Sequence, residues 1–197
     1  GKVQPQDELE TLVLEAHRRG LKVHLDGARL FNAHIHSGLS LSALVGSFDS
    51  VSICLSKGLI APVGSLLVSD QTIINKAIRL RKMLGGGMRQ VGVIASCGMY
   101  ALKNNIERLQ QDHDNAKLLA DGLSLISELK VKYDESQTNM VFINCPKDHR
   151  ESLTNFLLDH QIVISSLDRG RFVCHLGINE KDISFVIEVF RAYFKKQ

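Results

Sequence analysis

The chain has 197 residues, of which 44% are hydrophobic and 23% are charged, values that are typical of a folded globular protein and exclude a disordered one. Its net charge of +3 is not gathered into a basic block, and no apolar run reaches the length of a membrane span, so neither nucleic acid nor a membrane is predicted as a partner. The four cysteines form no CxxC pair, which favours reduced thiols in a cytoplasmic protein over a disulfide framework or a zinc site.

The first part of the chain has the rhythm of an α/β protein with a parallel sheet. Asp7 and Glu10 form a predicted N-cap, apolar residues follow at helical spacing, and Gly20 is placed to end the helix. Alternation over residues 21–25 then predicts a strand, and Asp26 stands where this strand ends. In parallel sheets ligands bind outside the carboxyl ends of the strands, so Asp26 is in a position to contact a ligand, and the alternative is that it only caps a helix or turn.

Lys57 lies between two further predicted strands, over residues 50–55 and 63–68. One interpretation is an exposed turn, because lysine ammonium groups are rarely buried. The other is chemical, because a neutral lysine amine forms a Schiff base with an aldehyde. Asp26 adds to the second interpretation, since pyridoxal phosphate needs both an imine and an anion that keeps its ring nitrogen protonated.

Two arginines are candidates for binding a carboxylate. Arg29 follows Asp26 closely, and Arg171 opens a predicted strand over residues 171–176. A planar guanidinium binds a carboxylate through two parallel hydrogen bonds. For both residues a surface position, with an ordinary ion pair, is the alternative.

Two other patterns are less specific. The glycines at positions 85–87, followed by Arg89, form either a hinge or a loop whose N–H groups face a phosphate. His34 and His36 make an HxH pair, but no Cys, Asp or Glu completes a ligand set, so no metal site is predicted.

Two helical segments precede a change in the organisation of the chain. A predicted basic helix over 70–82 is followed by a proline-free helical stretch over 92–123, broken mildly at Gly98, in which Asp112, His113 and Asp114 are expected on a solvated face. Short strands and helices then alternate in a way that indicates a small α+β domain with an antiparallel sheet. The predicted strands cover 138–144, 161–165 and 171–176, and the predicted helices cover 149–160 and 180–194. The predicted organisation is a large domain over 1–95, a connecting helix over 96–123 and a small domain over 124–197.

Several long motifs, taken together and in order, strongly resemble the threonine aldolases, which are fold-type-I pyridoxal-phosphate enzymes of the aspartate aminotransferase superfamily. The motifs are HLDGARLFNA at 24–33, SICLSKGL at 52–59, APVGS at 61–65 and RKMLGGGMRQ at 81–90. The resemblance implies an α/β fold class: the C-terminal part of the large, cofactor-binding domain followed by the small α+β C-terminal domain.

The resemblance also implies roles for particular residues. Lys57 looks like the lysine that forms the Schiff base with pyridoxal 5'-phosphate, and Asp26 matches the carboxylate that pairs with the pyridine nitrogen. Lys82 and Arg89 fall in a segment that reaches across a subunit interface in the family. The implied cofactor-binding residues are Lys57, Asp26, Arg29 and Arg89, and the implied substrate-binding residues are Arg29, Arg171 and Lys82.

The implied reaction is a retro-aldol cleavage of threonine or allo-threonine to glycine and acetaldehyde, in a homotetramer built as a dimer of dimers. Two alternatives remain open from the sequence: an inactive, truncated remnant of such an enzyme, and another fold-type-I pyridoxal-phosphate lyase or aminotransferase.

The sequence departs from the family in two places. The N-terminal part of the family's large domain is missing, so we expect a sheet with an unpaired edge and an exposed apolar face. Ile60 stands where the family usually has glycine, three residues after Lys57. A β-branched residue is unfavourable at positive φ, so we expect this loop to be altered.

Overall fold

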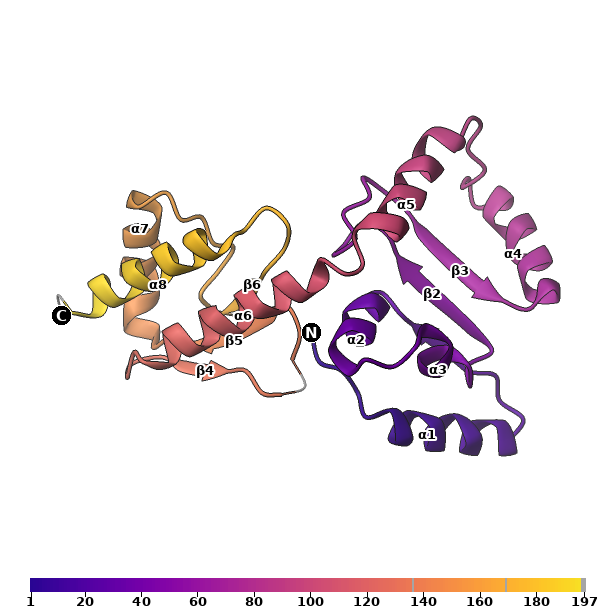
Figure 1. Cartoon of the computed structure of the whole chain (residues 1–197), viewed down its shortest axis with the longest axis horizontal. Helices are drawn as coiled ribbons and strands as arrows, with labels where there is room; N and C mark the ends of the chain where they lie inside the picture. Colours follow the sequence, from indigo (N-terminus) through magenta and orange to yellow (C-terminus); the bar gives the residue numbers. More distant parts are fainter. Residues whose placement is uncertain (136, 169, 196–197) are drawn as a thin grey trace. The chain divides into compact units, whose positions relative to one another are not determined.

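The computed structural model describes residues 1–135, 137–168 and 170–195 and consists of two compact units (Figure 1). One unit comprises Val3–Leu109, and the other comprises Gly1–Lys2 together with Gln110–Gln197. The boundary between the units therefore falls inside the segment predicted to be the connecting helix. None of the helices in the described ranges is long and apolar enough to cross a membrane.

The first unit contains a three-stranded sheet whose strands are β1 (His24–Asp26), β2 (Ser50–Cys54) and β3 (Ser65–Ser69), in the order β1-β2-β3. β1 and β2 are parallel, as the sequence predicted, and Leu25 lies opposite Val51. β3 runs antiparallel to β2, with Val51 opposite Val68. The sheet is therefore mixed, with β3 at one edge.

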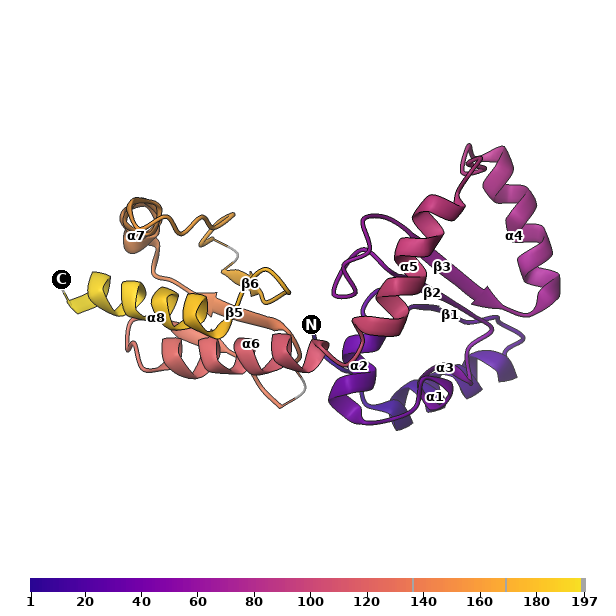
Figure 2. The same cartoon turned by 45° about the horizontal axis from the view of Figure 1, so that its top comes forward.

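Five helices accompany this sheet, and their bounds are α1 (Gln6–Arg18), α2 (Leu30–Ser37), α3 (Leu41–Val45), α4 (Gln71–Met83) and α5 (Gly92–Asn104). In both cartoon views α1, α2 and α3 lie together on one side of the sheet, α4 lies beyond β3, and α5 lies by the end of the sheet where β2 stops and β3 begins (Figures 1 and 2). Leu30, Leu44 and Val51 form the buried core between α2, α3 and the sheet. The N-cap predicted at Asp7 lies two residues earlier, at Pro5, where no side chain caps the helix.

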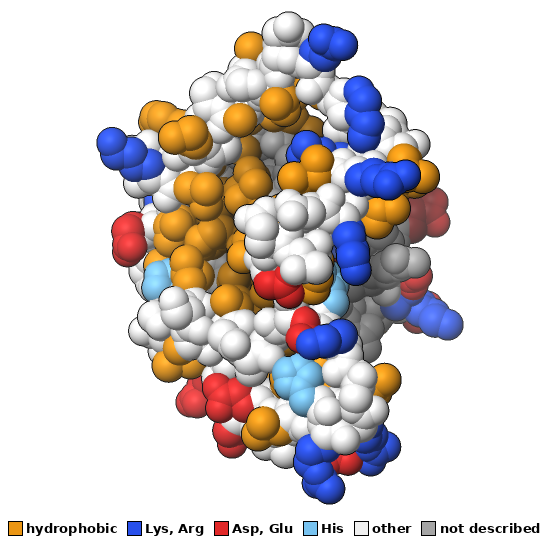
Figure 3. Space-filling view, turned by 90° about the vertical axis from the view of Figure 1, so that its right-hand side faces the viewer, with side chains coloured by type: hydrophobic (Ala, Val, Ile, Leu, Met, Phe, Trp, Pro, Cys, Tyr) orange, Lys and Arg blue, Asp and Glu red, His pale blue; other side chains and the backbone are white. Residues whose placement is uncertain are grey.

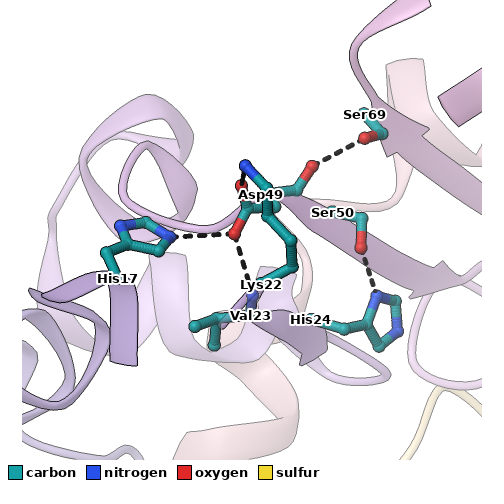
Figure 4. A network of polar contacts seen from close by, with 7 residues as sticks. All are labelled: His17, Lys22, Val23, His24, Asp49, Ser50 and Ser69. Atoms are coloured by element: carbon teal, nitrogen blue, oxygen red, sulfur yellow. Dashed lines mark hydrogen bonds and ion pairs between the residues drawn. The ribbon is translucent and has the colours of Figure 1, made fainter. Parts of the chain in front are cut away.

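Asp49 fixes the amino end of the sheet (Figure 4). Its carboxylate accepts hydrogen bonds from the Lys22 ammonium and the Val23 N–H, each at 2.8 Å, and lies 2.8 Å from His17 Nε2. The Lys22 ammonium, the Val23 N–H and His17 hold the pKa of Asp49 below its ordinary value. This network joins the end of α1, the start of β1 and the start of β2, and so sets the register of the parallel pair.

The β3 side of this unit is apolar and exposed. Leu66, Leu67 and Val68 of β3 are all exposed, none of the α4 side chains is buried, and on α5 Val93 and Met99 are 74% and 73% exposed. Figure 3 views the molecule from the right-hand side of Figure 1 and shows hydrophobic side chains gathered in a hollow on that face. β2 is the only strand paired with β3 in the part of the chain that the structure describes. The expected unpaired edge and apolar face are confirmed.

The second unit is the α+β arrangement predicted for the end of the chain. Its antiparallel strands, in spatial order, are β4 (Lys130–Lys132), β5 (Met140–Asn144) and β6 (Arg171–Val173). Its helices are α6 (Leu109–Ser124), α7 (Lys147–Asp159) and α8 (Glu180–Lys195). Leu123, Val141, Leu153 and Phe190 lie at the centre of its core. β4 was not predicted, and the strand predicted over 161–165 is wrong, because that segment has no ladder partner and follows α7 as an irregular turn.

The prediction for 92–123, one long helical stretch with a mild break at Gly98, is also wrong, because Gly98 lies inside a helix and the break comes after Asn104. The structure has two helices there, α5 and α6, with Asn105 as the C-cap residue of α5. Asp112 and His113 are buried rather than solvated, with 1% and 6% of their surfaces exposed. The helical period explains this, because positions 112, 113, 116, 119, 120 and 123 fall on one stripe of α6, and that stripe faces the core.

Candidate functional site

Asp26 and Lys57 both lie at the carboxyl ends of the parallel strands β1 and β2. Asp26 is the last residue of β1 and lies opposite Ser52 in the parallel register, and Lys57 follows the end of β2. Because β1 and β2 are parallel neighbours, their carboxyl ends lie side by side. Both side chains are exposed, so an amine and a carboxylate are available there to a ligand.

The turn after β1 is shaped by Gly27. A Cβ atom at this position would lie 2.8 Å from the Ser52 carbonyl oxygen, so the two strands approach as closely as only glycine allows. Asp26 Oδ1 accepts a hydrogen bond from the Ala28 N–H at 3.2 Å. This is the turn cap that short acidic side chains commonly make, and it holds the carboxylate at the end of the strand.

Residues 55–61, the Lys57 loop, form a tight turn. The Ile60 N–H donates to the Lys57 carbonyl at 2.9 Å, and the Ala61 N–H donates to the Leu55 carbonyl at 3.0 Å. Leu55, Leu59 and Ala61 are buried, whereas Lys57 is exposed. Ile60 has φ 63°, in the left-handed region that favours glycine, so the strain expected from this substitution is present.

The other predicted site residues lie on three different elements. Arg29 is the half-buried N-cap residue of α2, directly after the Asp26 turn. Lys82, in the last turn of α4, and Arg89, in the α4–α5 connection, are exposed, and Lys82 lies against Gly87. Arg171 begins β6 in the second unit and is exposed. The structure therefore brings Asp26, Arg29 and Lys57 to the carboxyl ends of β1 and β2 in the first unit.

Two side chains that sequence reasoning missed contact the Lys57 loop. Asn105 Nδ2 donates to the Leu59 carbonyl at 2.7 Å, and an Arg108 guanidinium nitrogen donates to the Gly58 carbonyl at 3.1 Å. Both residues belong to the connection between α5 and α6. The available signal was the polar pair Asn104–Asn105 inside a predicted helix, because asparagine is a weak helix former.

Histidines and cysteines offer no second centre in the described ranges. His34 Nδ1 lies 2.6 Å from the Leu39 carbonyl oxygen, and no group of three or more potential metal ligands occurs among the described residues. All four cysteines are free thiols, with Cys145 and Cys174 buried. Burial raises the pKa of the Cys174 thiol to about 12, which makes it unreactive.

Comparison with known proteins identifies the class of protein to which this chain belongs. The model of the beta-eliminating lyase family matches residues 1–146, which is most of the chain. The chain belongs to the beta-eliminating lyase family.

Curated relatives give the closer likeness. The low specificity L-threonine aldolase of Escherichia coli O157:H7 is 41% identical over 196 residues, an alignment that takes in 100% of this chain and 58% of that protein. The chain thus spans just over half the length of such relatives. The resemblance to threonine aldolases, stated above from the motifs, is confirmed.

Solved structures confirm the fold class. A structure from Listeria monocytogenes assigned as an L-allo-threonine aldolase has a TM-score of 0.82 at 21% identity, covering 98% of this chain and 57% of that one. A serine palmitoyltransferase from S. paucimobilis with bound PLP–myriocin aldimine has a TM-score of 0.72 at 19% identity, covering 98% of this chain and 50% of the other.

Proposed function

We propose that this chain carries the cofactor lysine and part of the active site of a pyridoxal-phosphate-dependent lyase that cleaves threonine or allo-threonine to glycine and acetaldehyde. The single observation that carries the proposal is the placement of Lys57 and Asp26 at the carboxyl ends of the adjacent parallel strands β1 and β2. The names of the curated relatives support the substrate, and the serine palmitoyltransferase, which has PLP bound, supports the cofactor.

The residues present at this edge fit the cofactor. Lys57 offers an exposed amine, which pyridoxal phosphate needs for covalent attachment, and Asp26 offers an exposed carboxylate for the ring nitrogen. Gly27 lets the chain turn tightly against the Ser52 carbonyl oxygen directly after Asp26. When bound, pyridoxal phosphate supplies an electron sink for the bond that breaks at the amino-acid α-carbon.

Each candidate residue then has a defined task. The Lys57 amine holds the cofactor in place, and the Asp26 carboxylate keeps a proton on the ring nitrogen. Arg29 binds the carboxylate of the amino acid, for which its planar guanidinium is suited. We assign Arg171 and Lys82 to substrate binding and Arg89 to the cofactor phosphate on the strength of the motif resemblance.

We further propose that the working protein is a homo-oligomer, a dimer of dimers. The exposed apolar side chains of β3, α4 and α5 support this proposal, because contiguous apolar surface of this kind marks an interface. The cytoplasmic localisation expected from the cysteines stays a prediction.

The reaction is tested by adding pyridoxal phosphate and threonine to the full chain and measuring glycine and acetaldehyde. We expect both products from the parent chain and neither from Lys57→Ala. A keto acid in place of acetaldehyde would contradict the lyase assignment and favour an aminotransferase-type reaction.

A second candidate is a chain that binds the cofactor without turning substrate over. The partial coverage of the relatives favours it, because the chain spans only 58% of the Escherichia coli O157:H7 threonine aldolase and carries part of the proposed site. Its signature is a cofactor bound at Lys57 in the parent chain with no acetaldehyde released at saturating threonine.

A further inference from the structure

The Lys57 loop adopts a conformation that its own sequence does not favour. Ile60 has φ 63°, and left-handed backbone is unfavourable for a β-branched residue. Strained backbone of this kind persists only where the surrounding structure determines it. The loop therefore needs contacts from outside its own residues.

Those contacts come from the connection between α5 and α6. Asn105 and Arg108 donate to two consecutive carbonyl groups of the loop, those of Leu59 and Gly58, at 2.7 and 3.1 Å. Both donors are half-buried and distant from the loop in sequence, so these bonds are tertiary contacts. The two accepting carbonyl groups belong to the peptide groups on either side of Leu59, which stands two residues after Lys57.

Packing closes the same side of the loop. A Cβ atom at position 58 would lie 2.7 Å from Leu109 Cδ2 and 3.4 Å from Asn32 Oδ1. Gly58 is therefore seated between the start of α6 and α2. Leu59 and Leu109 belong to one buried cluster, so the polar contacts lie beside an apolar anchor.

We propose that Asn105 and Arg108 are positioning residues for Lys57: their two hydrogen bonds hold the strained loop so that the amine leaves the sheet beside Asp26. The proposal rests on the proposed function, because it assigns these residues to the attachment of the cofactor. Neither residue is placed among the groups that touch substrate or cofactor.

The first measurement uses hydrogen exchange in the cofactor-free chain. Asn105→Asp keeps the shape of the side chain but removes the N–H donor. Its matched control is Asn104→Asp, because the Asn104 amide donates only within its own helix, to the Tyr100 carbonyl. We expect the Ile60 and Ala61 amides to exchange about tenfold faster in Asn105→Asp, as for the loss of one hydrogen bond. Equal exchange in the two variants would overturn the proposal.

A rescue variant keeps the test independent of any general loss of stability. Ile60→Gly removes the strain, so Asn105→Asp combined with Ile60→Gly is expected to exchange more slowly at Ala61 than Asn105→Asp alone. A general destabilisation by Asn105→Asp would instead speed exchange throughout the first unit, including β2, and that result would contradict a local role.

The second measurement asks whether the loop geometry affects Lys57 itself. The full chain is incubated with pyridoxal phosphate, reduced with borohydride, and the pyridoxyl group on Lys57 is compared with that on the exposed Lys103. We expect the Lys57 to Lys103 ratio to fall several-fold in Asn105→Asp and to stay at the parent value in Asn104→Asp. If the Lys57 to Lys103 labelling ratio stayed at the parent value in both variants, Asn105 would not position Lys57, and the inference would be overturned. A parent chain that is not labelled at Lys57 would instead contradict the proposed function.

Discussion

Asp26 lies opposite Ser52 in the parallel register of β1 and β2, so the carboxylate and the lysine that follows β2 emerge on the same edge of one sheet. The register is held at the other end by Asp49, which joins β1 to β2 through Val23. The amino ends of the two strands are thus held together by Asp49, and their carboxyl ends present the carboxylate and the amine that pyridoxal phosphate requires.

Ile60→Gly is expected to stabilise the chain. Removing a β-branched residue from left-handed backbone recovers roughly 1–2 kcal/mol, and the greater freedom of glycine in the unfolded chain offsets about half of that. We therefore expect the free energy of unfolding, measured by urea denaturation, to rise by roughly 0.5–1 kcal/mol. Ile60→Ala, which keeps a Cβ atom, serves as the control and should gain less. A loss of stability in Ile60→Gly would contradict the strain.

Asp49 makes the first unit sensitive to acid. Its pKa in the folded chain lies below the ordinary value of 3.8, so the stability it contributes is present above that value and is lost as the pH falls through the lower one. We expect Asp49→Asn to be less stable than the parent at pH 7 and to lose less stability on acidification from about pH 5 downward. The measurement is the urea midpoint as a function of pH. Glu8→Gln, which removes an exposed carboxylate, should retain the parent's pH dependence.

The buried thiols are expected to resist alkylation. Because the thiolate is the reactive form, a pKa of about 12 for Cys174 predicts alkylation by iodoacetamide at pH 8 that is at least about a hundredfold slower than for a partly exposed cysteine. Peptide mapping over time should find Cys54 and Cys97 modified first. All four cysteines should react at similar rates in urea, and early modification of Cys174 in the folded chain would contradict its burial.

The apolar surface on α5 is expected to make the isolated chain associate. Val93 and Met99 are among its most exposed members, and replacing both with lysine should reduce association and dye binding. Light scattering over a range of concentrations measures the effect. Leu125→Lys, which also removes a highly exposed leucine but lies in the second unit, is the control and should leave association unchanged.

The grouping of Asp26 and Lys57 at the carboxyl ends of β1 and β2 could be predicted because its sequence signals are local. Apolar alternation ends at Asp26 and again just before Lys57, and polar residues at successive strand ends converge in a parallel sheet. The left-handed conformation of Ile60 could be expected because the resembling family has glycine there.

The contacts of Asn105 and Arg108 could not be predicted because they depend on tertiary structure. The Asn104–Asn105 pair only weakens a helix over 92–123, and the break arises where two side chains donate to carbonyl groups on a loop far away in sequence. Asp112 and His113 illustrate the same limit, since their polarity suggested solvent whereas the position of α6 in the fold buries them.

The most direct test of the central claim is to find the lysine that binds the cofactor. The chain is incubated with pyridoxal phosphate, reduced with borohydride, digested and mapped by mass spectrometry, with Lys57→Ala treated in parallel. We expect a pyridoxyl group on Lys57 as the dominant adduct, together with an absorbance band of the lysine-bound cofactor that Lys57→Ala lacks. A dominant adduct on another lysine, or an unchanged band in Lys57→Ala, would contradict it.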